Sequence, residues 1–378
     1  MAIMRVLGLM SGTSADGVDA VLAQFNGSPR RPRWCIERSA FHPYPAELRQ
    51  NLIAVGQGDA RSSAQLLELA EAITEAQAAA ATACDPKGSA ELVGCHGQTI
   101  WHRPPASDKR GASWQLLQGP LLAQLLQRPV VFEFRAQDLA LGGQGAPLVP
   151  PCDEALLGRT GGWRALLNLG GIANLTLIPP ASGPGSHAPV RGWDCGPANT
   201  LLDLAVQQFS GGAQTHDAGG TWALAGQVHE PLVQRWLQES YLQQPPPKST
   251  GRELFGRPDL QRRLEELGRA GAEPADALAT LAAFSAAAVA QDLARGPRPI
   301  ELLVAGGGAR NGALMQQLRW RCTGMAVRPL EELGIADSQR EALAFALLAW
   351  WHWRGIPGSA PSVTGAARAA VLGVCARL

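Results

Sequence analysis

The chain has 378 residues, of which 46% are hydrophobic, and this length predicts two domains rather than one very large core. A formal net charge of +1, from 33 basic and 32 acidic residues, gives no reason to expect a nucleic acid or a charged membrane as partner. Lysine occurs only at Lys87, Lys109 and Lys248, and none of these lies in a GxxxxGK[ST] motif, which excludes a P-loop.

The cysteines and the apolar segments predict a soluble, cytoplasmic protein. The seven cysteines are scattered, odd in number and without a CxxC pair, which is typical of free thiols and not of disulfides or a zinc site. The start of the chain carries Arg5 and does not resemble a signal peptide. The longest apolar helix-like run, at 277–290, is shorter than the roughly 20 residues that a membrane span needs.

The run GLMSGTSADGVDA, at 8–20, is the most informative segment of the chain. An apolar strand breaks into a small polar turn, and a return strand follows, with apolar residues spaced mostly by two. Such a turn can place backbone N–H groups and hydroxyls around a phosphate, whereas the Walker A and Rossmann turns lead into a helix. The pattern therefore points to the actin-like ATPase superfamily of sugar kinases, although by itself it also fits a plain hairpin.

The next elements predict an α/β lobe. An alanine-rich helix at 62–83 precedes a strand at 91–95, and the segment 111–127 includes a helix before a strand at 129–134. The run 140–151 is rich in glycine and proline, so we interpret it as the crossing into a second lobe.

Two further glycine turns repeat the opening pattern. A strand at 165–169 ends in Gly170 and Gly171 and returns as a second strand, after which 181–189 forms a loop or hairpin tip. A strand at 301–305 ends in Gly306, Gly307 and Gly308, and the chain continues as a helix at 312–322. The third turn lacks side chains, as it must if an adenine or ribose lies flat on its backbone.

The rest of the chain completes a two-lobed organisation. Residues 245–247 form a rigid proline stretch, 331–353 contains the last major helix, and 370–374 is an apolar strand. We predict a first lobe of residues 1–138 plus 350–378 and a second lobe of residues 139–349. The expected fold is a two-lobed actin-like ATPase (ribonuclease H-like) α/β fold with the nucleotide in the interlobe cleft.

The motifs together resemble the anhydro-N-acetylmuramic acid kinase family over almost the whole length. The combination of HGQT with GGQGAPLVP is far more specific than the glycine turns, which many sugar kinases share. The motifs are SGTSADGVD (11–19), CHGQTIWHRP (95–104), FRAQDLALGGQGAPLVP (134–150), NLGGIANLT (168–176), DCGPANTLLD (194–203), STGRELFG (249–256), LLVAGGGARN (302–311), EALAFALLA (341–349) and PSVTGA (361–366).

The resemblance implies a kinase that uses ATP and Mg²⁺ on a small amino sugar. Water opens a 1,6-anhydro ring at C1 while O6 takes the γ-phosphoryl group, and the product, N-acetylmuramic acid 6-phosphate, belongs to peptidoglycan recycling. The family's base corresponds to Asp194, which we expect in a loop before a helix at 199–209. Alternatively, Asp194 only forms an Asx turn or caps that helix. The family also suggests a homodimer, for which the tryptophans at the end of the last helix would suit an interface.

The remaining site residues follow from the same resemblance. The first turn should hold the β- and γ-phosphates with Thr13 and Ser14 as hydroxyl donors, and Asp16 is a candidate for reaching Mg²⁺ through water, whereas Asp19 could instead only stabilise the turn. Asn311 either caps its helix or touches the nucleotide, and Glu341 acts near the substrate or is an exposed helix-start carboxylate. The nucleotide-binding set is Gly12, Thr13, Ser14, Ala15, Asp16, Gly17, Val18, Asp19, Gly170, Gly171, Gly306, Gly307, Gly308 and Asn311. The sugar-binding set is His96, Gln98, Arg135, Gln144, Gly145 and Asn199; the metal ligands stay open.

Some positions depart from the family pattern, and other functions stay open. Ala198 replaces a usual glycine, Glu133 replaces a usual aspartate, and 151–153 replaces a segment that usually carries a histidine. The alternatives are a kinase of another sugar in the same superfamily and a non-enzymatic ATP-gated clamp.

Overall fold

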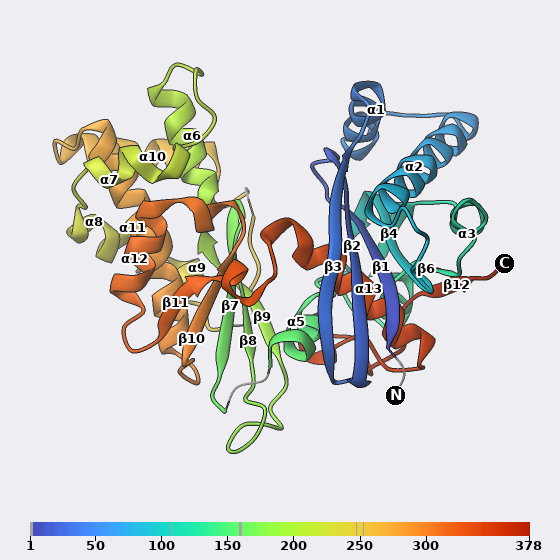
Figure 1. Cartoon of the computed structure of the whole chain (residues 1–378). Helices are drawn as coiled ribbons and strands as arrows, with labels where there is room; N and C mark the ends of the chain where they lie inside the picture. Colours follow the sequence, from blue (N-terminus) through green and yellow to red (C-terminus); the bar gives the residue numbers. More distant parts are fainter. Residues whose placement is uncertain (1–2, 107, 159–160, 247, 252) are drawn as a thin grey trace. The chain divides into compact units, whose positions relative to one another are not determined.

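The structure is a computed structural model that describes residues 3–106, 108–158, 161–246, 248–251 and 253–378. It divides into two compact units (Figure 1): unit 1 comprises Met1–Arg159 and Gly334–Leu378, and unit 2 comprises Thr160–Leu333. The boundaries that we expected after residue 138 and before residue 350 are therefore wrong. The glycine- and proline-rich run at 140–151 stays within unit 1, and so does the whole of the last major helix, because that helix packs on the first sheet.

Unit 1 contains a seven-stranded sheet in the order β12-β6-β4-β1-β2-β3, with β5 paired to β4. The strands β1, β2 and β3 are antiparallel, and β4 runs parallel to both β1 and β6. The helix expected within 111–127 is α3, which confirms that prediction, whereas the strand β5 in the first half of the segment was not expected. Strand β12 begins where the expected strand at 370–374 ends. The strands are β1 (Met4–Ser11), β2 (Gly17–Ser28), β3 (Arg31–Pro43), β4 (Leu92–Arg103), β5 (Ala112–Leu116), β6 (Val130–Phe132) and β12 (Val374–Ala376).

Helices α2 and α13 cover opposite faces of this sheet. Leu7 and Leu9 of β1 pack in the core cluster with α2, whereas Gly8, between them, faces α13. A Cβ on Gly8 would overlap the carbonyl oxygen of Ala342, and one on Gly94 would overlap that of Phe345, so α13 can cross β1 and β4 only over glycines. The helices are α1 (Ala46–Gly56), α2 (Ser63–Cys84), α3 (Gly119–Leu126), α4 (Ala136–Ala140), α5 (Pro150–Leu157), η4 (Asp337–Gln339), α13 (Arg340–Trp353) and α14 (Pro361–Thr364).

The tryptophans of α13 belong mainly to the core of unit 1. Trp350 is fully buried, with its ring centroid 5.6 Å from that of Phe25, and Trp351 donates a 2.8 Å hydrogen bond to the carbonyl of Pro29. Trp353 alone of the three is exposed, at 44%. The expected tryptophan-rich interface is therefore reduced to one exposed ring.

Unit 2 repeats the strand order of unit 1 in a five-stranded sheet, β11-β10-β7-β8-β9. In both sheets the first three strands are antiparallel and the fourth runs parallel to the first. This repeated order is the ribonuclease H-like topology of the actin-like fold, which confirms the expected α/β fold class. The strands are β7 (Arg164–Leu169), β8 (Ile172–Ile178), β9 (Arg191–Pro197), β10 (Glu301–Ala305) and β11 (Ala326–Pro329).

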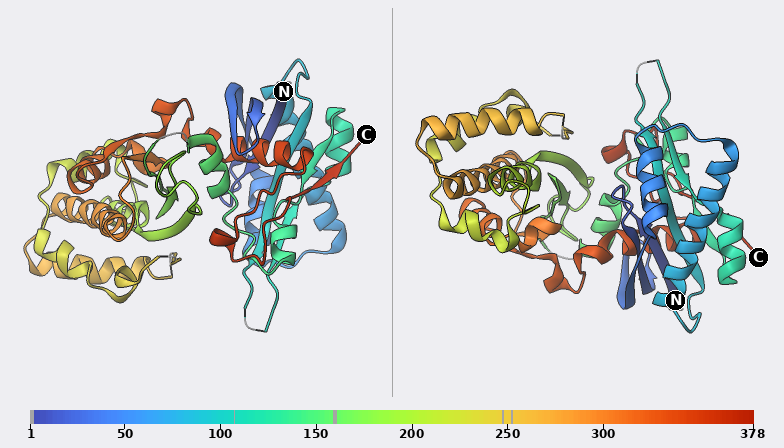
Figure 2. Two further views of the ribbon diagram at one scale, coloured as in Figure 1. Left: turned by 90° about the horizontal axis from the view of Figure 1, so that it is seen from below. Right: turned by 90° about the horizontal axis from the view of Figure 1, so that it is seen from above.

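Helix α11 (Pro274–Ala294) is the central helix of unit 2, and Figure 2 shows it among the other helices of that unit. Of the helices in the described residues, it alone is long and apolar enough to cross a membrane, but 83% of its apolar window is buried inside the protein, as in a core helix. The other helices are α6 (Asn199–Phe209), η1 (Ala218–Gly220), α7 (Thr221–Ala225), α8 (Glu230–Trp236), α9 (Ser240–Gln243), α10 (Arg257–Arg269), η2 (Gly307–Arg310), α12 (Gly312–Arg321) and η3 (Leu330–Leu333).

Candidate active site

The turn between β1 and β2 closes an antiparallel hairpin in unit 1, at the place where a phosphate-binding turn was predicted. The N–H of Ala15 donates to the carbonyl of Gly12 at 3.1 Å, and Ala15 adopts a positive φ of 48°. Thr13, Ser14 and Asp16 are exposed at the tip, where the Ser14 hydroxyl donates to Asp16 Oδ1 at 3.0 Å. The turn therefore exposes the hydroxyls of Thr13 and Ser14 and the carboxylate of Asp16 to solvent.

The side chain of Gln98 is hydrogen-bonded to Ser11 and Gly12, where β1 enters this turn. Its Nε2 donates to the carbonyl of Gly12 at 3.0 Å, and its Oε1 accepts from the Ser11 hydroxyl at 2.5 Å. The side chain is 1% exposed. Because both ends of the amide are used within the protein, Gln98 positions the turn at Gly12, and its contact with the sugar stays a prediction.

Carboxylates gather beside the hairpin. Burial, together with the negative charges of Asp16, Glu341 and Asp337, raises the pKa of Asp19 to about 6. Asp19 lies on β2, and Glu341 is exposed in the first turn of α13. Among the described residues, no group of three or more His, Cys, Asp or Glu side chains can hold a metal ion alone.

His96 and Arg135 form a buried contact in unit 1. The Nε of Arg135 donates to His96 Nε2 at 3.1 Å, and the imidazole packs against Phe345 with a centroid distance of 4.6 Å. Burial, followed by the charge of Arg135, lowers the pKa of His96 to about 3. The histidine is therefore neutral at physiological pH, and it accepts the hydrogen bond that orients the guanidinium.

Asp138 organises the loop around Gly145, whose carbonyl accepts a hydrogen bond from Nη1 of Arg135. Arg135 Nη1 donates to the carbonyl of Gly145 at 2.7 Å, and the Gly145 N–H donates to Asp138 Oδ2 at 2.8 Å. The Thr364 hydroxyl donates to Asp138 Oδ1, also at 2.8 Å. The backbone carbonyl of Thr364 accepts from the N–H of Gln144. Asp138 is fully buried, whereas Gln144 is exposed. Asp138 and Thr364 were not predicted as site residues, although both lie within the quoted motifs.

In unit 2, the start of α6 holds the second glycine turn. Asn199 Nδ2 donates to the carbonyls of Leu169 and Gly170, both at 2.8 Å, and backbone N–H groups of 198–200 donate to Gly170 and Gly171. Each trans peptide points its N–H away from its carbonyl, so this arrangement directs the N–H edge of the turn away from α6. Asn199 therefore supports the Gly170–Gly171 turn, and its contact with the sugar stays a prediction.

The triple-glycine turn packs directly on the second turn. A Cβ on Gly308 would lie 2.6 Å from the Cβ of Leu169, and Gly306 has a φ of 85°. A short 3-10 helix, η2, follows the turn, and α12 then begins at Gly312, which confirms the expected start of that helix. Asn311 Oδ1 accepts from the backbone N–H groups of Ala313 and Leu314 at 3.0 and 3.1 Å, which confirms the capping role of Asn311.

Asp194 lies in strand β9, and not in the loop that we expected. Asn174 stands opposite on β8 and donates to Asp194 Oδ1 at 2.8 Å. The Ser249 hydroxyl and the Thr250 N–H donate to Oδ2 at 2.9 and 3.0 Å. The alternative of a helix cap is wrong, because Ala198 is the N-cap of α6. These three partners of Asp194 were not predicted as site residues, although the motifs at 168–176 and 249–256 contain them.

The three departures from the family pattern have different surroundings. Ala198 is fully buried, and Glu133 adopts a positive φ of 57°, with burial raising the pKa of its carboxyl. Asp153 accepts two hydrogen bonds from Arg340, at 3.1 and 2.6 Å, in a buried ion pair. Because Arg340 precedes Glu341, this pair fixes the start of α13.

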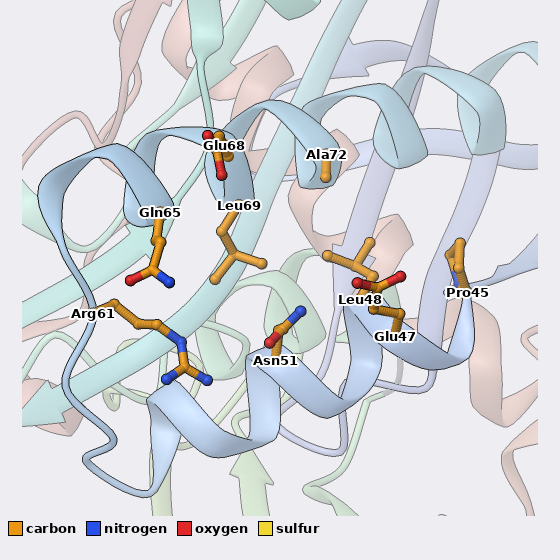
Figure 3. Close-up of a pocket in the computed structure, with 9 residues that line it drawn as sticks. All are labelled: Pro45, Glu47, Leu48, Asn51, Arg61, Gln65, Glu68, Leu69 and Ala72. Carbon is orange, nitrogen blue, oxygen red and sulfur yellow. The ribbon is translucent and has the colours of Figure 1, made fainter.

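A cavity of about 350 Å³ lies between α1 and α2 (Figure 3). Its polar side chains come from both helices and from the loop between them, and it contains no residue of the predicted site. It is lined by Pro45, Glu47, Leu48, Asn51, Arg61, Gln65, Glu68, Leu69 and Ala72.

The chain matches the family described as "Anhydro-N-acetylmuramic acid kinase" over residues 4–377. A protein of that name from Synechococcus sp. (strain CC9902) is 65% identical over 376 residues, which cover 98% of this chain and 99% of the relative. One from Prochlorococcus marinus (strain MIT 9303) is 62% identical with the same coverage. A solved ROK hexokinase from Thermus thermophilus is 17% identical, with a TM-score of 0.36 over 93% of this chain and 100% of that chain, a likeness too distant to carry an argument. The family match extends over nearly the whole chain, and the chain belongs to the anhydro-N-acetylmuramic acid kinase family.

Proposed function

We propose that the protein is an ATP-dependent kinase that opens the ring of 1,6-anhydro-N-acetylmuramic acid and phosphorylates O6. The product is N-acetylmuramic acid 6-phosphate, an intermediate of peptidoglycan recycling. The substrate is inferred from the family, and the observation that carries the mechanism is the Asp194 carboxylate, which three donors hold in one orientation.

Asp194 is the proposed base for ring opening. Water adds at C1, the C1–O6 bond breaks, and O6 takes the γ-phosphoryl group, so a separate acid for the leaving oxygen is less necessary. A carboxylate has about four lone-pair sites, and Asp194 Oδ2 accepts two protein donors whereas Oδ1 accepts one. We therefore assign Oδ1 as the oxygen that takes the proton of the attacking water, as in an inverting glycosidase.

The glycine turns are the proposed ATP-binding elements. The hairpin of unit 1 and the Gly170–Gly171 turn supply N–H groups and hydroxyls to the phosphates, and the triple-glycine turn supports the adenosine. The crowded carboxylates around Asp19 fit Mg²⁺, because this ion takes one or two carboxylates together with phosphates and water. When bound, Mg²⁺ offsets the charge of the transferring phosphoryl group. The nucleotide cleft between the lobes stays a prediction.

The proposed sugar-binding residues lie around Arg135. His96 and Gly145 orient its guanidinium, whose planar set of donors suits the lactyl carboxylate of the sugar. Gln144, exposed on the same loop, is a proposed contact to the acetamide, and Glu341 is proposed to act beside the substrate.

The cellular compartment and the oligomeric state are proposed from the composition and the family. We propose that the enzyme works in the cytoplasm as a homodimer, with a small amino sugar as its partner and with neither nucleic acid nor membrane. Free cysteines support the reducing compartment: all seven are unpaired among the described residues.

The test is incubation with ATP, Mg²⁺ and 1,6-anhydro-N-acetylmuramic acid in ¹⁸O-labelled water, followed by mass spectrometry of the product. We expect a phosphorylated sugar with one ¹⁸O at C1. N-acetylmuramic acid and glucose, which have a free O6, serve as comparison substrates. Phosphorylation of these alone would indicate another sugar kinase, and ATP binding without any sugar product would indicate a clamp.

A further inference from the structure

A buried ion pair lies behind the strand that carries Asp194. Lys248 Nζ is 3.0 Å from Asp292 Oδ1, and the two side chains are 2% and 0% exposed. Burying two charges carries a desolvation penalty that their attraction repays only with good geometry and further hydrogen bonds. A buried ion pair is thus weak evidence for stability. Its position beside Asp194 instead suggests a role in the site.

The pair is completed by neighbours from three elements of unit 2. Trp193 Nε1 donates to Asp292 Oδ2 at 3.1 Å, and Arg295 Nη1 donates to Oδ1 at 3.2 Å. Lys248 Nζ lies 5.0 Å from the ring centroid of Tyr241. The carboxylate of Asp292 is therefore held by three donors, and the ammonium of Lys248 has both an anion and an aromatic face as partners.

The same residues hold Asp194 on several sides. The Asp194 N–H donates to the carbonyl of Lys248 at 3.0 Å, and the Tyr241 hydroxyl donates to the Asp194 carbonyl at 2.7 Å. The two residues after Lys248, Ser249 and Thr250, donate to Asp194 Oδ2. The N–H and Oδ2 of Asp194 thus depend on residues 248–250, and its carbonyl depends on Tyr241 of α9.

The segment 248–250 must be held in place by contacts outside itself. Residues 248–250 have no regular secondary structure, and Ser249 is exposed. Irregular surface segments are mobile unless buried contacts fix them. Lys248 is the buried residue of the three, so its ion pair with Asp292 is the contact that ties the segment to α11.

We infer that Lys248 and Asp292 are positioning residues for the Asp194 base. Their ion pair fixes the segment so that Ser249 and Thr250 engage Oδ2 and leave Oδ1 directed at the attacking water. The assignment of a base rests on the proposed function, whereas the positioning of the segment does not.

The test compares Lys248→Met with the double variant Lys248→Met/Asp292→Leu. The single variant leaves a buried carboxylate without its ammonium, so its melting temperature falls by on the order of 10 °C. The double variant removes both charges and recovers most of this loss. In both variants we expect kcat for phosphosugar formation to fall about 100-fold with the KM for ATP unchanged, because small displacements of a catalytic group cost that much. Arg269→Met, whose side chain is 75% exposed in a surface ion pair, is the matched control with wild-type kcat.

Hydrogen–deuterium exchange over residues 248–251 supplies a readout that does not need the sugar. We expect faster exchange there in the double variant at a temperature where it is fully folded. Wild-type exchange or wild-type kcat in the stable double variant would overturn the inference. A wild-type enzyme without phosphosugar formation would contradict the proposed function instead, and the exchange rates would still decide whether the ion pair fixes the segment.

Discussion

Removal of the Asp138 carboxylate should loosen the loop that holds Arg135. Asp138 is fully buried and accepts hydrogen bonds from the Gly145 N–H and the Thr364 hydroxyl, both at 2.8 Å. Asp138→Ala removes both acceptors and leaves two donors buried. Hydrogen bonds to a charged group contribute about 1.5–3 kcal/mol each, so we expect a loss of about 3–6 kcal/mol in the free energy of unfolding.

Two milder variants test the reasoning behind this value. Asp138→Asn keeps an acceptor for Gly145 and turns its Nδ2 toward Thr364, so we expect a loss of about 1 kcal/mol. Thr364→Val removes one of the two hydrogen bonds and should lie between the other variants. Asp59→Ala, with a side chain 60% exposed and its nearest cation at 3.9 Å, is the control without effect.

Urea unfolding measures the stability, and initial rates measure the KM for the sugar and for ATP. Because Gly145 also accepts from Arg135, Asp138→Ala should raise the KM for the sugar and leave that for ATP unchanged. A loss below 1 kcal/mol together with an unchanged sugar KM would refute the role assigned to Asp138.

Two further predictions concern the face of unit 1 that carries Glu341. Because the folded pKa of Asp19 is raised to about 6 from 3.8, the stability that it contributes is complete below pH 4 and is lost as the pH rises through 6. Asp19→Asn should therefore stabilise the protein at pH 7 by about 1 kcal/mol, a value reduced for solvent screening because Asp19 is half-exposed. The same variant should bind MgATP more weakly. If its stability in urea changes between pH 4 and pH 7 as that of the wild type does, the prediction fails. Gly94→Ala places a Cβ against the Phe345 carbonyl, so we expect the free energy of unfolding to fall by about 1–3 kcal/mol and kcat to fall through displacement of α13. Gly268→Ala, where a Cβ meets open space, is the control. Wild-type stability of Gly94→Ala would be inconsistent with that packing.

The sequence was sufficient to predict the glycine turns and the strands around them. Alternating apolar residues and glycine-rich turns are local signals, and the turn at Gly12 lies where those signals placed it. The strand β5 was missed because it forms by pairing with β4 rather than by its own pattern. The lobe boundaries were misplaced because the packing of α13 on β1 and β4 is a tertiary contact that composition does not reveal.

The roles of several site residues could not be predicted from the sequence. Gln98 and Asn199 lie in quoted motifs, but only the structure shows that their amides hold backbone carbonyls at the first two glycine turns. Asp194 lies in a segment with glycine and proline that is typical of a loop, yet it pairs as a strand with β8. The partners Asp138 and Thr364 are 226 residues apart, a separation that no local pattern connects.

The most direct test of the account is the turnover of Asp194→Asn in ¹⁸O-labelled water, with binding of ATP and of the anhydro sugar measured by calorimetry. An amide keeps the shape of the side chain but cannot take a proton from water, and general-base catalysis contributes about 10²–10⁴-fold. The account predicts wild-type dissociation constants for both ligands and a fall in turnover of that size. Turnover within tenfold of the wild type, with ¹⁸O still incorporated at C1, would contradict the assignment of Asp194 as the base.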